Sequence, residues 1–154
     1  MKVAEHYCAF VETEKAQGFS YLIKARDVLL NLYANALKLP DVPVTSDVRF
    51  EQTVAKDDRT AIFEKLASNI GNARFYWETF DPTEELEQKP TYEDLMDDMA
   101  DIYWDLKTSL QTYKLGTPDA QEHALWEMKF TFGAHWGYHN INALRALHYW
   151  ISNG

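Results

Sequence analysis

The chain has 154 residues, of which 46% are hydrophobic, and it carries a formal net charge of −9 and one cysteine. This composition excludes a disordered chain, and the lone Cys8 excludes an internal disulfide framework and a multi-cysteine zinc site. The negative charge argues against nucleic acid as a ligand, because phosphates require a basic surface. The sequence shows neither a signal peptide nor an apolar run of the ~20 residues that a membrane span needs. We therefore expect one cytoplasmic helical domain over residues 1–154.

Helical periodicity dominates the first half of the chain. Apolar residues recur every three or four positions in three segments, 3–11, 22–37 and 62–70. Pro40 ends the second of these helices, and Asp57 or Asp58 is suitably placed to begin the third. The sole candidate for a β-strand in the sequence is residues 48–54.

Two longer helices are predicted in the second half. Thr91 is a suitable N-cap for the first of them, with Asp94 completing an approximate capping box, and Gly116 ends it. Pro118 opens a last helix that runs to Ser152. The pattern as a whole predicts an all-α fold, an antiparallel bundle of four to five helices with a long C-terminal helix.

Residues 135–139 of the last helix are predicted to form the centre of the domain, because this helix carries apolar residues on two faces. Trp136 should be buried, with its indole N–H bonded to a backbone carbonyl or a carboxylate. His148 is expected to be a hydrogen-bonded core residue, and Gly133 and Gly137 indicate either a close backbone approach or a kink. The stripe predicted to face the core contains Trp126, Phe130, Ile141, Leu144, His148 and Ile151.

The negative charge is concentrated in residues 78–105. This segment holds eleven of the 24 acidic residues and one of the 15 basic residues, a charge of −10. On a helix, four of these acids lie within about 60° of one another, and we call them the carboxylate row: Asp94, Asp98, Asp101 and Asp105. Like charges at this spacing destabilise a helix by roughly 0.2–0.5 kcal/mol a pair. We expect solvent and the helix N-terminus, the cation of Arg26, a bound cation or a basic partner to offset them.

The acidic segment supports the hypothesis of a non-enzymatic interaction or adaptor domain. Acidic surfaces attract basic partners, and tryptophan is enriched among the residues that dominate interfaces. Helical phase places Trp104 away from the apolar stripe, so it either contacts a partner or is covered by another element. The predicted contact residues are Trp77, Asp94, Asp98, Asp101 and Trp104, the partner is an unknown protein, and the chain is a monomer or a small homo-oligomer.

Two histidines support the alternative of a metal-binding bundle with hydrolytic or redox chemistry. His135 and His139 are four residues apart, so a helix presents them on one face. Carboxylates on a neighbouring helix could complete a divalent metal site, with Asp98, Asp101, Asp105, His135 and His139 as the candidate ligands. The Glu-x-x-His and His-Glu-x-x-His motifs are both missing, so the pair could also serve in packing or at the surface. Apart from this metal, we expect no cofactor.

Nucleophilic catalysis finds no support in the sequence, because it contains no Gly-x-Ser-x-Gly, no P-loop and no dinucleotide-binding glycine motif. We therefore predict no catalytic residues. Small-molecule binding is a third alternative, in a pocket lined by Trp126, Phe130, Trp136 and Trp150, although the same residues serve equally as a core.

Several segments resemble those of a known family, both in their amino-acid sequences and in their order along the chain. They are FYWETFDP at 75–82, DDMADIYWDLK at 97–107, and the group WEMKFTF, HWGYH and ALRALH within 126–148. Over residues 75–148 the chain resembles a bacterial family of small helical proteins, the domain of unknown function numbered 5063. The resemblance implies an all-helical bundle in the bacterial cytoplasm and no assigned activity. Its pattern would place a basic residue where Trp104 stands.

Overall fold

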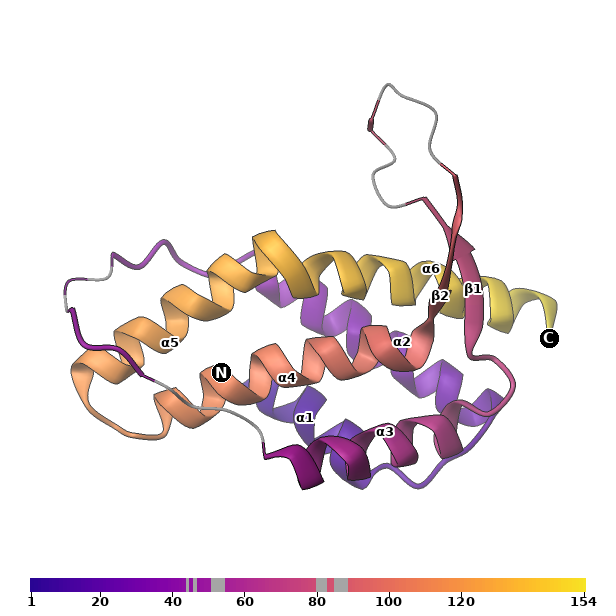
Figure 1. Ribbon diagram of the computed structural model, residues 1–154, viewed down its shortest axis with the longest axis horizontal. Helices are drawn as coiled ribbons and strands as arrows, with labels where there is room; N and C mark the ends of the chain where they lie inside the picture. Colours follow the sequence, from indigo (N-terminus) through magenta and orange to yellow (C-terminus); the bar gives the residue numbers. More distant parts are fainter. Residues whose placement is uncertain (44, 46, 51–54, 80–82, 85–88) are drawn as a thin grey trace.

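The computed structural model describes residues 1–43, 45, 47–50, 55–79, 83–84 and 89–154, with the backbone alone at 56 and 57. As predicted, the fold is a helical bundle (Figure 1). Its helices are α1 (Lys2–Thr13), α2 (Phe19–Ala36), α3 (Lys56–Ile70), α4 (Leu95–Tyr113), α5 (Pro118–Thr131) and α6 (Gly137–Asn153), with a π-helix, η1 (Phe132–Trp136), between the last two. Among the described residues, we find no helix long and apolar enough to cross a membrane.

Helix α4 is the centre of the bundle. It packs against α1, α3, α5 and α6, while α2 packs chiefly on α1 and α6. The apolar spacing predicted for this helix is confirmed, and its inward side is fully or almost fully buried at Leu95, Met99, Ile102, Leu106 and Leu110. Because α4 has neighbours on several sides, polar residues at the edge of its apolar stripe also come into contact with other helices.

A two-stranded antiparallel hairpin precedes α4 and was not predicted. It pairs β1 (Phe75–Glu78) with β2 (Thr91–Asp94) and projects from one end of the bundle (Figure 1). Thr91 therefore lies in a strand rather than capping the helix, and Asp94 is the N-cap, accepting a hydrogen bond from the Met96 amide. Aromatic residues favour strands, which explains β1. The predicted strand is absent at 48–50, and 51–54 lie outside the described residues.

The predicted last helix is interrupted by the π turn. The chain changes direction where α5 passes through η1 into α6 (Figure 1). At Gly137 a Cβ atom would lie 2.1 Å from the Phe132 carbonyl oxygen, so a side chain does not fit there without movement of the backbone. Of the two interpretations of the glycine pair, the break in the helix is the one observed.

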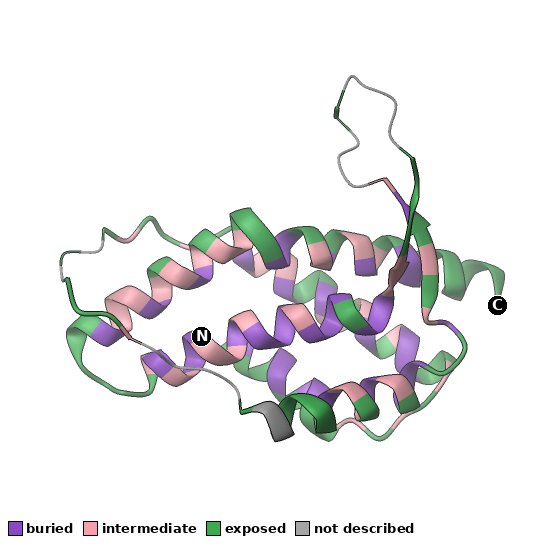
Figure 2. Cartoon of the chain, in the orientation of Figure 1, coloured by how far each residue is buried: buried purple, intermediate pink, exposed green. Residues whose placement is uncertain are grey.

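The predicted core residues of the last helix are buried only in part. Trp136 is 1% exposed, and its indole N–H donates to the Met128 carbonyl at 3.2 Å, as predicted. The prediction was wrong for Trp126, Phe130, Ile141 and His148, all of which are exposed. Figure 2 shows exposed residues along both α5 and α6. Trp126 and Phe130 lie on α5 before the π turn, and Ile141 and His148 lie on α6 after it, so the predicted stripe faces outward in both helices. The bundle instead covers another side of this segment, at Met128, Trp136 and Leu147.

We predict that Trp136→Ala lowers the free energy of unfolding by on the order of 3–5 kcal/mol, because it leaves a large cavity in the core. Trp150→Ala is the matched control, since Trp150 is 37% exposed, and it should cost much less. Chemical denaturation of both variants measures the difference. Equal losses would contradict the central position of Trp136.

Candidate functional site

The antiparallel packing of α4 against η1 and α6 brings the carboxylate row onto the two histidines. Asp98 accepts a hydrogen bond from Nδ1 of His139 at 2.8 Å, and Asp105 accepts one from Nδ1 of His135, also at 2.8 Å. Asp101 lies between them along α4, with its Oδ2 3.5 Å from Nε2 of His139. Successive turns of two neighbouring helices thus form a ladder of acid–imidazole contacts.

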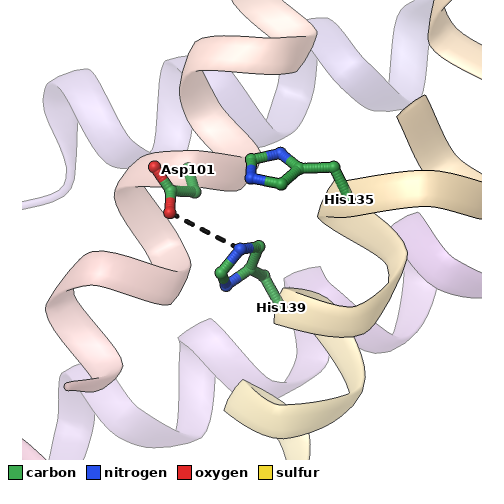
Figure 3. Close-up of side chains that lie close together, drawn as sticks. All are labelled: Asp101, His135 and His139. Carbon is green, nitrogen blue, oxygen red and sulfur yellow. Dashed lines mark ion pairs between the residues drawn. The ribbon is translucent and has the colours of Figure 1, made fainter. Parts of the chain in front are cut away.

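Three of these side chains converge on one point (Figure 3). One potential ligand atom from each of Asp101, His135 and His139 lies within 4.8 Å of the other two. A tetrahedral ion with bonds of about 2.1 Å holds its ligand atoms about 3.4 Å apart, so the Asp101–His139 separation already suits a shared ion. The side chains of Asp101 and His135 are 36% and 48% exposed, which leaves the group open to solvent.

The predicted ligand set divides into two roles in the structure. Asp98 and Asp105 contact the Nδ1 atoms of the histidines, whereas Asp101 contacts the Nε2 side of His139. Asp98 also accepts a hydrogen bond from the hydroxyl of Tyr76 on β1. Because both oxygens of Asp98 are engaged and its side chain is 7% exposed, this carboxylate is poorly placed to reach an ion.

The electrostatics of the site follow from these contacts. Burial alone would lower the pKa of His139, but the hydrogen bond to Asp98 and the charges of Asp98 and Asp101 outweigh it and raise the pKa. Burial raises the pKa of Asp98 despite the opposing hydrogen bonds from His139 and Tyr76. Burial likewise raises the pKa of Asp105 against the effect of His135. The histidines are thus part of what offsets the carboxylate row.

Arg26 does not pair with the row, contrary to our prediction. It bonds to Asp27 at 2.7 Å, because α2 packs chiefly on α1 and α6. The cation that meets the row is Arg74, whose Nε donates to Asp94 at 2.7 Å. Arg74 precedes β1, a strand that was not predicted, so helical periodicity could not reveal this pair.

The structure divides the predicted interaction residues into covered and exposed ones. Trp104 is buried against Phe63 and beneath the guanidinium of Arg59, both on α3, so it is covered rather than free for a partner. Asp98 is buried, and Asp94 is engaged as a helix cap and ion pair. Trp77, at 62% exposure, is open to solvent.

Glu78 is a buried acid near the site that was not among our candidates. Its Oε2 atom has no hydrogen-bond partner among the described residues, and burial raises the pKa of its carboxyl to about 7, with the charges of Asp98 and Glu93 adding to the effect. Glu78 is buried because it lies on the same side of β1 as Tyr76, which contacts the bundle, and alternate residues of a strand face opposite sides. The sequence signal would have been the strand alternation within 75–78.

The raised pKa of Glu78 predicts a specific pH dependence. A carboxyl with a folded-state pKa above its unfolded value destabilises the fold as it ionises, so this penalty develops as the pH rises from about 4.5 through about 7. Glu78→Gln should therefore be more stable than the parent at pH 8, by on the order of 2 kcal/mol, and the difference should shrink below pH 4.5. The free energies of unfolding of the parent and the variant at both pH values measure this difference, and Glu84→Gln, at an exposed position, is the control. A difference independent of pH would contradict it.

Comparisons with known proteins agree with this fold. No curated protein matches the chain. The solved structure of protein BF1032 from Bacteroides fragilis is similar, with a TM-score of 0.80 and 27% identity over 96% of this chain and 86% of that one. A family model matches residues 1–153, well beyond the segment where the sequence resemblance was distinctive. The chain belongs to the family described as Domain of unknown function (DUF5063).

Proposed function

We propose that this helical protein binds a divalent transition metal through His135, His139 and Asp101. The observation that carries the proposal is the convergence of two imidazoles and a carboxylate within 4.8 Å. The carboxylate comes from α4 and the imidazoles from η1 and α6, which pack against it. The alternative roles in packing or at a plain surface would not require the three groups to meet.

The donor set indicates the class of metal. Imidazole nitrogen favours borderline ions such as Zn²⁺ and Fe²⁺, whereas Mg²⁺ and Ca²⁺ prefer sites built from oxygen. Two histidines and one carboxylate are the ligands of several catalytic zinc sites and of mononuclear iron sites with open positions. Three protein ligands on a solvent-open surface leave room for water or a substrate, which supports Lewis-acid or redox chemistry here.

A proton competes with the metal at this site. Protonated His139 can bridge Asp98 and Asp101 through its two nitrogens, which lie 2.8 and 3.5 Å from the carboxylates. A metal ion would take the place of the Nε2 proton and satisfy the same carboxylate. Because the proton and the metal compete for Nε2 and the pKa of His139 is raised, metal affinity should increase with pH until this imidazole has lost its proton.

We expect calorimetric titration with Zn²⁺ to show one site, and Mg²⁺ to bind far more weakly. His135→Gln, His139→Gln and Asp101→Asn should each weaken Zn²⁺ binding by more than about tenfold. His148→Gln and Asp97→Asn are matched controls, since both side chains are exposed and lie on the same two helices. The absence of binding by the parent, or equal affinities in all five variants, would contradict the proposal.

The exposed side of the hairpin supports a second candidate function, protein interaction. Phe75, Trp77 and Tyr92 are all exposed there and form a ring cluster, with centroid separations of 5.3 Å for Phe75–Tyr92 and 4.9 Å for Trp77–Tyr92. We call these three residues the aromatic face. Clustered exposed aromatic side chains are typical of interaction sites, and the neighbouring acids favour a basic partner.

For this second function we expect Trp77→Ala and Tyr92→Ala to abolish capture of a specific protein from native cytosol, without a large change in unfolding midpoint. Tyr149→Ala is the control, because Tyr149 is equally exposed but lies on α6. Capture should weaken as salt rises if charge contributes. Retention of the same protein by all three variants would exclude the aromatic face as the contact.

A further inference from the structure

We infer that Asp98 and Tyr76 are positioning residues that orient His139 toward the metal, an inference that rests on the proposed function. They form a chain of contacts across three elements: Tyr76 on β1 donates to Asp98 on α4, and Asp98 accepts from His139 on α6. The same contacts remove Asp98 from the set of ligands suggested by the sequence.

The geometry of Asp98 separates it from Asp101. Its Oδ1 is bonded to His139 and its Oδ2 to Tyr76, and its side chain is 7% exposed. Asp101 is 36% exposed and has an oxygen on the Nε2 side of His139. An ion arriving from solvent would therefore meet Asp101 and leave Asp98 in place behind the imidazole.

The bond to Asp98 determines which nitrogen of His139 can bind an ion. A carboxylate at Nδ1 holds the proton on that nitrogen in the neutral ring, so the lone pair lies on Nε2. Nε2 faces Asp101, where the three potential ligand atoms converge. Partners of this kind also make the imidazole a better electron donor, and their removal typically weakens metal binding by about 10–100-fold.

Asp105 also contacts Nδ1 of its histidine, His135, but this pair is more exposed and, in the part of the chain that the structure describes, has fewer hydrogen-bond partners. The side chains of Asp105 and His135 are 22% and 48% exposed, and no tyrosine hydroxyl is bonded to Asp105 among the described residues. The Tyr76–Asp98–His139 chain is the more enclosed of the two arrangements. We therefore assign the larger positioning effect to Asp98, with Tyr76 fixing the orientation of its carboxylate.

The test combines Zn²⁺ titration with a direct view of the histidine protons. Asp98→Asn, which keeps the shape of the side chain, should weaken Zn²⁺ binding at least about tenfold, and Tyr76→Phe should weaken it less. In metal-free protein labelled with ¹⁵N at histidine, NMR should show His139 as the Nδ1–H form. In Asp98→Ala, the ring should shift toward the Nε2–H form. Tyr103→Phe is the matched control, because its hydroxyl donates to Glu12 rather than to the site.

The outcomes distinguish this inference from the proposed function. If the parent protein does not bind Zn²⁺, the proposed function itself is wrong. If the parent binds Zn²⁺ while Asp98→Asn keeps the parent affinity and Asp98→Ala keeps the Nδ1–H form, the positioning role is wrong and the metal site stands. A changed coordination number in the Co²⁺ spectrum of Asp98→Asn would instead make Asp98 a ligand. If Tyr76→Phe binds Zn²⁺ with the same affinity as Tyr103→Phe, Tyr76 has no positioning role.

Discussion

The packing of α4 against η1 and α6 is the contact on which the other features of this protein depend. The apolar stripe of α4 is buried among α1, α3, α5 and α6, and at its edge the contact with η1 and α6 pairs Asp98 with His139 and Asp105 with His135. Asp101 lies on the turn of α4 between these two aspartates, so the same register brings it within 4.8 Å of both imidazoles. A site of two histidines and a carboxylate is therefore a direct product of how two helices of the core meet.

Paired charges at this depth are not explained by stability alone. Removing a carboxylate from water is costly, and its attraction to a partner often does no more than offset that cost. Asp98 lies in such a position, and burial raises the pKa of its carboxyl although His139 and Tyr76 both donate to it. Replacing such a pair with apolar residues of similar volume is often neutral or stabilising. The presence of hydrogen-bonded acids and imidazoles there is the reason to look for a function in binding.

The hairpin links this site to the surface, because its side chains alternate between the side that faces the bundle and the side that faces solvent. One side of the ribbon directs Tyr76 and the buried Glu78 toward the bundle, and the other exposes the aromatic face. The two candidate functions thus arise from opposite sides of one short sheet. Asp94 connects the hairpin to the bundle, since it pairs with Arg74, ends β2 and caps α4.

Local pattern by itself determined the helical class, the apolar side of α4, the burial of Trp136 and the pairing of His135 with His139 on one face, because each depends on neighbours within a few turns. Tertiary structure decided the rest. The π turn before Gly137 divides the predicted last helix in two, and packing left Trp126 and Phe130 on the exposed side of α5. Which carboxylate meets which nitrogen depends on the relative position of α4 and α6, which are far apart in the chain. The burial of Trp104 depends on how α3 packs on α4, and the pairing of Arg74 with Asp94 depends on the hairpin. Sequence spacing places side chains on a face, but only packing between elements determines what that face meets.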